Sequence, residues 1–163
     1  MIVYHGSTEI IKNPDVLHSK KYLDFGKGFY ITTFENQAKK WAVRKGMRQE
    51  KTAIVNIYEL SEKWDDYRVL SFEKENEKWL DFVCGCRKGQ PLNEAFDIII
   101  GNVADDDVFK TVDMYFRGLW DKEKVLNELR YYKMNNQLCI VNQKTLNQLI
   151  TFKRSYEVKS NGR

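Results

Sequence analysis

The sequence has little proline, cysteine or histidine, and it has no long hydrophobic run. A C-x-C pair at Cys84 and Cys86, with Cys139 far along the chain, gives an odd cysteine count, and only two histidines accompany it. That set suits neither a disulfide framework nor a zinc site, so we expect reduced thiols and no metal. No window approaches the roughly 18 apolar residues of a membrane span. Because no basic stretch followed by an apolar one begins the sequence, we expect a cytoplasmic protein without a membrane segment.

What remains is enough for one packed domain covering residues 1–163. That length leaves no room for two domains of usual size, and 42% hydrophobic with 13% aromatic residues can build a core. The net charge of +4 is mild. Basic residues cluster at 39–51 and 153–163, which we interpret as a solvated helix face and a charged tail. The alternative is attraction for an anionic ligand such as a dinucleotide or RNA.

Hydrophobic patterning predicts strands near both ends of the chain with helices between them, which is typical of an α+β fold. Thr32 and Glu35 have capping-box spacing, so a helix is predicted at 34–47. The apolar run 96–101 is typical of a central strand. The other predicted strands are 2–4, 28–32, 52–60, 68–72, 137–141 and 152–158, and the other predicted helices are 73–84, 108–119, 122–132 (after an Asp121 cap) and 144–149.

Two short motifs and one later aromatic residue carry the functional signal. The first is Tyr-His-Gly-Ser at 4–7, and the second is Gly-Lys-Gly-Phe-Tyr at 26–30, with Trp41 eleven residues after Tyr30. This arrangement resembles the NAD-binding half of the ADP-ribosyltransferases of the poly(ADP-ribose) polymerase and diphtheria-toxin type. The resemblance implies two small β-sheets packed face to face, NAD as the substrate in the cleft between them, and flanking helices. The residues that it implies at the NAD site are His5, Gly6, Ser7, Gly28, Tyr30 and Trp41.

The resemblance also assigns roles that suit the chemistry of NAD. Tyr30 and Trp41 sandwich the cationic nicotinamide ring, since aromatic faces attract cations. Gly6 pairs with the nicotinamide carboxamide through its backbone, which no side chain blocks. His5 contacts the adenine-side ribose through a hydrogen bond. These four residues together predict an enzyme that breaks the bond between nicotinamide and ribose.

One position departs from that family's pattern. The family places a glutamate at the start of a late strand, where it binds the nicotinamide ribose, and the matching residue here is Gln137. An amide can hydrogen-bond the ribose, but it neither supplies a negative charge nor acts as a general base. His5, Tyr30 and Gln137 are therefore the expected catalytic residues. The acidic turn at 105–107 is a candidate source of a replacement acid, although a solvated turn or helix cap is the simpler interpretation of each residue.

The whole chain also resembles an uncharacterised bacterial family of that superfamily, in which a glutamine begins the late strand. The matching segments are 24–30, 37–42, 97–101, 104–106 and Gln137. The resemblance implies that Gln137 is a choice of the family rather than decay of one protein. Genes of this kind often lie beside a small partner gene, which suggests a toxin–antitoxin pair with a small antitoxin protein. That step is association rather than chemistry.

Several other residues have a plain structural interpretation. Trp79, Phe82, Phe96 and Phe116 are read as core residues. His18 and Arg87 are read as surface residues, with pairing to a phosphate as the alternative for Arg87. His5 taken alone would be an ordinary histidine at a strand end, and Trp41 lies on an apolar helix face that suits either a core or a binding role.

Three functions remain. The first is a mono-ADP-ribosyltransferase that cleaves NAD and transfers ADP-ribose to a macromolecular acceptor, either protein or nucleic acid. The second is a binding module for NAD or ADP-ribose that lost its chemistry together with the glutamate. The third is a small RNA-cleaving toxin that uses His5 and the basic segment 39–51.

Overall fold

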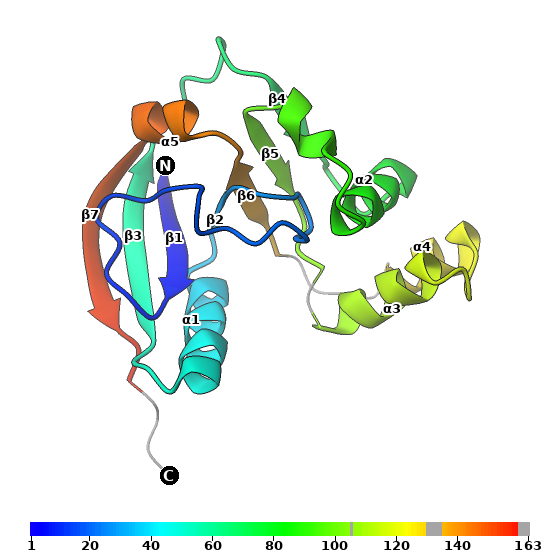
Figure 1. Ribbon diagram of the computed structural model, residues 1–163, viewed down its shortest axis with the longest axis horizontal. Coiled ribbons are helices and arrows are strands. Elements are labelled where there is room, and N and C mark those ends of the chain that lie inside the picture. The colour runs from blue at the N-terminus through cyan, green and yellow to red at the C-terminus, as the bar shows by residue number, and fades with distance from the viewer. Residues whose placement is uncertain (105, 130–134, 160–163) are drawn as a thin grey trace.

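Two small β-sheets form the centre of the computed structural model, which describes residues 1–104, 106–129 and 135–159 (Figure 1). The antiparallel three-stranded sheet has the order β1 (Ile2–Ser7), β3 (Ile54–Leu60) and β7 (Ile150–Glu157). The four-stranded sheet has the order β2 (Phe29–Ile31), β6 (Gln137–Ile140), β5 (Ile98–Gly101) and β4 (Val69–Ser71). Only the β4–β5 pair is parallel among these strands. The predicted α+β class is confirmed, and the run at 96–101 supplies an interior strand as predicted.

Helices flank the two sheets. They are α1 (Glu35–Gln49), α2 (Glu77–Arg87), α3 (Asp106–Phe116), α4 (Lys122–Leu129) and α5 (Gln143–Leu149), with a short 3₁₀ helix at Leu92–Ala95. Figure 1 shows the β1–β3–β7 sheet and α1 on one side of the molecule and α2, α3 and α4 at the opposite end. None of the helices described is long and apolar enough to cross a membrane.

The two sheets pack against each other through one buried cluster. Val3 and Tyr58 come from the three-stranded sheet, and Phe29, Ile31 and Ile140 come from the other. Because side chains alternate along a strand, the residue between Phe29 and Ile31 must point away from this interface. That residue is Tyr30, so the alternation places it on the outer face of the four-stranded sheet.

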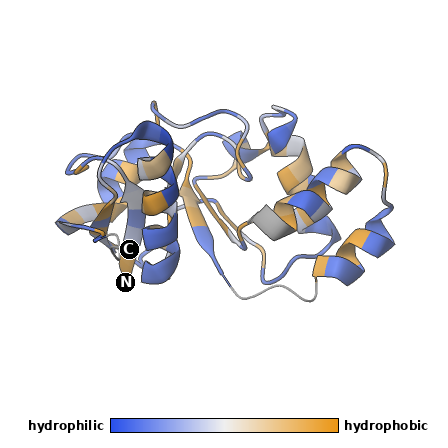
Figure 2. Cartoon of the chain, turned by 90° about the horizontal axis from the view of Figure 1, so that it is seen from below, coloured by the Kyte–Doolittle hydropathy of each residue, from blue (hydrophilic) through white to orange (hydrophobic). Residues whose placement is uncertain are grey.

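The outer face of the four-stranded sheet is covered by the block of helices α2, α3 and α4. Trp79, fully buried on α2, centres a cluster that also includes Phe25 and Cys139. Figure 2 shows hydrophobic and hydrophilic residues side by side along these helices, as expected of amphipathic elements. Phe82 and Phe96 pack on the cluster as predicted. The core assignment of Phe116 was wrong, because its side chain is 38% exposed near the end of α3.

The predicted capping box is also wrong. The N-cap of α1 is Phe34, which makes no side-chain cap. Thr32 is held in an extended bridge two residues earlier, so its hydroxyl accepts the Phe34 N–H at 3.1 Å and donates to Asn136 Oδ1 at 2.8 Å. The Glu35 carboxylate accepts the Tyr156 hydroxyl instead of a backbone amide. The predicted cap of α4 is confirmed, since Asp121 Oδ1 accepts the Lys124 N–H at 2.9 Å.

All three cysteines are buried free thiols, as predicted. Burial raises the pKa of Cys84 to about 11 and that of Cys86 to about 12, and it also raises the pKa of Cys139. These thiols are therefore protonated at neutral pH and behave as small apolar side chains.

Candidate functional site

The candidate site lies where β1 and β2 separate. Tyr4 and Thr32 exchange two backbone hydrogen bonds of 2.8 and 3.0 Å, and this pair is an isolated bridge. Next to this bridge, the His5 side chain takes the place of a backbone partner for Tyr30. Its Nδ1 lies 2.6 Å from the Tyr30 carbonyl oxygen. The two sheets therefore diverge at the point where the two sequence motifs meet.

The environment of His5 fixes its protonation. A carbonyl oxygen can only accept, so Nδ1 carries the proton and Nε2 is left as an acceptor. The imidazole stacks on Phe29, with 4.6 Å between the ring centroids. Burial lowers the pKa of His5 to about 4 despite its bond to the Tyr30 carbonyl, and the charge of Lys45 lowers it further. His5 is thus neutral at pH 7 and presents a hydrogen-bond acceptor at Nε2.

This pKa predicts an acid-sensitive fold. Between pH 6.5 and about 4 the unfolded chain binds a proton at residue 5 that the folded chain does not bind, so stability falls as the pH falls through this window. We expect the melting temperature of the wild type to drop more steeply across it than that of His5→Asn, whose side chain does not titrate. Thermal unfolding followed by circular dichroism at several pH values measures this, and parallel curves would contradict it.

Gly6 of β1 packs against α1, next to Trp41. A Cβ atom on Gly6 would lie 2.2 Å from the Ala38 carbonyl oxygen and 2.9 Å from the Trp41 Cβ, so only glycine lets α1 approach so closely. Backbone groups alternate between the two edges of a strand, so the Gly6 N–H and C=O point to the same edge as those of Tyr4. Among the described residues, no backbone partner takes them there. Trp41 is partly exposed and belongs to none of the three buried clusters of the described chain.

Ser7 and Gly28 have local structural roles. The Ser7 hydroxyl, which is buried, accepts the Glu9 N–H at 3.4 Å. Gly28 donates its N–H to Ser19 Oγ at 3.0 Å, and a Cβ there would lie 2.4 Å from Cys139 Sγ. Packing and turn formation thus account for these two residues, and their contact with NAD stays a prediction.

Tyr30 anchors the segment 25–28, which precedes β2 and contains two glycines, through its hydroxyl group. Its hydroxyl donates to the Gly26 carbonyl oxygen at 2.5 Å and accepts the Phe25 N–H at 3.1 Å. Burial raises its pKa well above 10, with Cys139 and Asp24 adding to the effect, so the hydroxyl stays protonated. The Tyr30 side chain shares the outer face of the sheet with that of Cys139, its partner across the strands. Its ring is therefore fixed between the loop and the strands.

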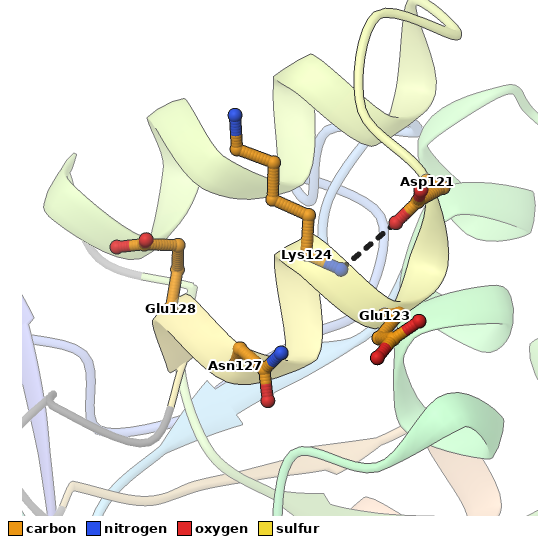
Figure 3. A pocket seen from close by; sticks show the side chains of 5 residues that line it. All are labelled: Asp121, Glu123, Lys124, Asn127 and Glu128. Carbon is orange, nitrogen blue, oxygen red and sulfur yellow. Dashed lines mark hydrogen bonds between the residues drawn. The ribbon is translucent and has the colours of Figure 1, made fainter.

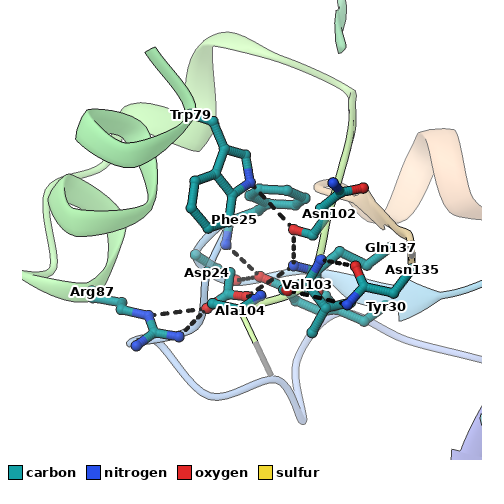
Figure 4. Close-up of polar contacts among 11 residues, drawn as sticks. Asp24, Phe25, Tyr30, Trp79, Arg87, Asn102, Val103, Ala104, Asn135 and Gln137 are labelled. Carbon is teal, nitrogen blue, oxygen red and sulfur yellow. Dashed lines mark hydrogen bonds and ion pairs between the residues drawn. The ribbon is translucent and has the colours of Figure 1, made fainter. Parts of the chain in front are cut away.

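Gln137 lies on that same face, two residues from Cys139 along β6. The side chain is only 3% exposed, and its Nε2 donates to Asp24 Oδ2 at 2.9 Å and to the Asn102 carbonyl oxygen at 3.3 Å (Figure 4). Both partners can only accept, so the amide nitrogen rather than the amide oxygen faces them. Oε1 is left as the one acceptor atom of this side chain.

Asp24 is a candidate site residue that the sequence analysis did not single out. It is buried, yet four donors meet its carboxylate: Arg87 through Nε and Nη2, the Ala104 N–H at 2.9 Å, and Gln137. Figure 4 shows Arg87 from α2, Ala104 from the segment between β5 and α3, and Gln137 from β6 around the Asp24 carboxylate. The surface assignment of Arg87 was wrong, because its guanidinium is 15% exposed and pairs with this acid. One signal was available, since Asp24 opens the 24–30 segment of the second resemblance.

The segment before Gln137 is anchored to α1. Gln37 donates from Nε2 to the Asn136 carbonyl oxygen at 2.7 Å, and Asn136 Oδ1 accepts the Thr33 N–H at 3.1 Å. Gln37 lies one helical turn before Trp41. The same helix therefore carries Trp41 beside Gly6 and fixes the entrance to β6.

The remaining candidate groups add nothing to this site. The side chains of the acidic turn, 105–107, lie outside the described residues. No group of three metal-binding side chains occurs in the part of the chain that the structure describes. A surface hollow lies on α4 (Figure 3). Its lining residues come from this helix and its N-cap, and none belongs to either motif: Asp121, Glu123, Lys124, Asn127 and Glu128. His18 is exposed as predicted, and its Nδ1 lies 2.8 Å from an Asp15 oxygen.

The chain matches a known protein family. The model of a family described as "Protein of unknown function (DUF3990)" matches residues 1–152, which include both motifs, Trp41, Asp24 and Gln137. A comparison with curated proteins found no match. The family description states no activity, so the expected ADP-ribosyltransferase chemistry stays a prediction that rests on the residues themselves.

Proposed function

We propose that this chain, which belongs to the DUF3990 family of unknown function, cleaves NAD and transfers ADP-ribose to a macromolecular acceptor. The observation that carries the proposal is the divergence of β1 from β2. There His5 is neutral with an acceptor at Nε2, the buried Gly6 has no described backbone partner for its N–H and C=O, and the partly exposed Trp41 of α1 packs against Gly6. The two-sheet α+β architecture is compatible with the fold of the ADP-ribosyltransferases.

Each of these groups suits one part of NAD. The Gly6 N–H would donate to the carboxamide oxygen of nicotinamide, and its C=O would accept from the carboxamide nitrogen. Trp41 would stack on the pyridinium ring, where a cation–π contact contributes roughly 0.5–2 kcal/mol. His5 Nε2 would accept a ribose hydroxyl. The Tyr30 ring, held by its hydroxyl, would form the second wall.

The reaction breaks one bond and forms another. The glycosidic bond between ribose C1′ and the nicotinamide nitrogen breaks, and its electron pair leaves with neutral nicotinamide. An oxygen or nitrogen of the acceptor then bonds to C1′ and releases its proton to solvent. The ribose is an oxocarbenium ion in between, so acceptor atoms close to it lower the barrier.

Asp24 and Gln137 together take the place of the missing glutamate in this proposal. Asp24 fixes the amide so that Oε1 is the atom available to a ribose hydroxyl. Arg87 balances the charge of Asp24, so the pair orients Gln137 rather than donating a full negative charge to the site. Slow transfer of a single ADP-ribose suits such a site better than chain elongation does.

A second candidate is a module that binds NAD or ADP-ribose without cleaving it. The neutral, buried Gln137 favours it, because no described carboxylate without a cationic partner stands beside this residue. The two candidates differ in one observable, which is free nicotinamide. Pairing with a small antitoxin protein stays a prediction under either candidate.

The decisive experiment incubates the purified protein with NAD labelled in the adenine ring and with a cell lysate, and it follows free nicotinamide and macromolecule-bound label. At an NAD concentration below KM we expect Trp41→Ala to release nicotinamide about 2- to 30-fold more slowly, because the lost cation–π contact weakens NAD binding. Trp120→Ala is the matched control, because Trp120 lies between α3 and α4, outside both motifs. A folded wild type that NAD stabilises but that releases no nicotinamide would establish the binding module instead.

A further inference from the structure

A second hollow adjoins the site on the side of the helical block. It has a volume of about 350 Å³ and lies between the 22–24 segment, the end of α2, and α3. The three aromatic residues that line it are all exposed to solvent: Tyr22 is 63% exposed, Phe109 46% and Phe116 38%. A group of neighbouring exposed rings with polar residues around it is typical of an interaction site.

Each of these rings has a cation close to it. Lys21 Nζ lies 5.7 Å from the Tyr22 ring centroid, the Arg87 guanidinium carbon lies 4.4 Å from that of Phe109, and Lys88 Nζ lies 5.1 Å from that of Phe116. All three distances are within the range of cation–π attraction. Arg87 lines the hollow itself, and Lys21 and Lys88 lie beside rings that line it.

The acidic residues of this hollow are neutralised within the protein. Asp24 pairs with Arg87, and Asp113 pairs with Arg117 at 3.0 Å. Lys21 and Lys88 have no acidic partner within 4 Å among the described residues. Among the described side chains, Lys21 and Lys88 thus leave positive charge without an acidic partner beside the aromatic rings, and this combination is complementary to stacked bases joined by phosphates.

We propose that this hollow binds single-stranded nucleic acid, and that the nucleic acid is the acceptor of ADP-ribose. The second half of this statement rests on the proposed function. Bases stack on the rings of Tyr22 and Phe116, and phosphates pair with Lys21 and Lys88. The Asp24 carboxylate lines the hollow and also accepts a hydrogen bond from Gln137, so this residue connects the hollow to the proposed NAD site.

The basic segment of α1 fits this ligand less well. Lys39 pairs with Glu35 at 3.8 Å, and Lys51, beyond the helix end, pairs with Glu9 at 3.7 Å, so part of its charge is compensated. Met47, on the same helix, is exposed but offers no ring for a base to stack on. The partly exposed ring of this helix, Trp41, is assigned to nicotinamide in the proposed function, so the hollow beside Phe116 is the better match to a single strand.

The test measures binding in the absence of NAD. A fluorescein-labelled single-stranded RNA of about 12 nucleotides, a length that suits one binding module, is titrated with the full chain at about 50 and 200 mM salt, and anisotropy is recorded. We expect Phe116→Ala to weaken binding about tenfold, since stacking on one ring is worth that much. Lys88→Ala should weaken binding and reduce its salt dependence by about one counterion. Lys40→Ala, an exposed lysine on α1, is the matched control and should bind almost as tightly as the wild type.

The outcomes separate this inference from the proposed function. Binding that Phe116→Ala and Lys88→Ala weaken, and that a duplex of the same sequence does not reproduce, supports the hollow as a single-strand site. No binding at low salt, or equal loss in Lys40→Ala, overturns it and leaves a protein as the acceptor. Nicotinamide release into water is recorded for the same variants and should stay at the wild-type level, because none of these residues belongs to the NAD site. Binding without any nicotinamide release by the wild type would instead reject the transferase and, with it, the acceptor role.

Discussion

Replacing Gln137 by glutamate, the residue of the resembling enzymes, is expected to destabilise this protein and to leave NAD cleavage no faster. In the wild type the amide nitrogen lies 2.9 Å from Asp24 Oδ2 and 3.3 Å from the Asn102 carbonyl oxygen. A glutamate would bring a carboxylate oxygen to the same place, against two acceptors and one existing negative charge. Leaving a buried charge without its partner costs about 3–5 kcal/mol.

The pH dependence of Gln137→Glu follows from the same repulsion. Because Asp24 and burial both disfavour the charged form, the pKa of the new carboxyl group must be raised in the folded state. A raised acid pKa gives stability that is present at low pH and is lost as the pH rises. The variant should therefore lose less stability at about pH 5 than at about pH 8, measured by urea unfolding at both values.

Two further variants show whether Asp24 is the cause. Gln148→Glu adds the same charge at an exposed glutamine that accepts the Tyr67 hydroxyl, and it should change stability by less than about 0.5 kcal/mol. Asp24→Asn combined with Gln137→Glu exchanges the two functional groups and restores a donor facing an acceptor. The double variant should be more stable than Gln137→Glu alone, and additive losses would show that the two residues are not coupled.

Gly6→Ala should be the second severe change. The added Cβ would lie 2.2 Å from the Ala38 carbonyl oxygen and 2.7 Å from the Ala42 nitrogen, both backbone atoms of α1. Neither can rotate away, so the helix must move off β1 and carry Trp41 with it. We expect a loss of about 3 kcal/mol, the upper end of the usual overpacking cost, and a melting temperature lower by about 10 °C.

Gly85→Ala is the control for this prediction. A Cβ there would lie 2.4 Å from Leu92 Cδ1, which is similarly close, but the neighbour is the tip of a flexible side chain. Alanine is also the better residue inside a helix, by about 1 kcal/mol. We expect Gly85→Ala to change stability by no more than about 1 kcal/mol. If both glycine variants melted at the same temperature, rigid backbone contact would not be what makes Gly6 necessary.

The sequence alone determined the helices and strands, and it identified the part of the candidate site that contains His5, Gly6 and Tyr30. Hydrophobic periodicity depends on neighbours along the chain, so the strands and helices were predicted to within a few residues of their observed ends. The motifs around His5, Gly6 and Tyr30 are short stretches of sequence as well, whereas the contacts of His5 with Tyr30 and of Gly6 with Trp41 join residues 25 and 35 positions apart. Properties set by contacts within one turn or one strand can be read from sequence spacing.

Only the tertiary structure decided how Gln137 is held. Its partner Asp24 is 113 positions away in the sequence, and 63 positions separate Asp24 from Arg87. No short sequence spacing therefore predicts that the three residues meet. Thr32 had the spacing of a helix cap, yet its pairing with Tyr4 drew it into an extended bridge. Buried polar side chains find their partners through packing of distant segments, because burial without a partner costs more than local preference can supply.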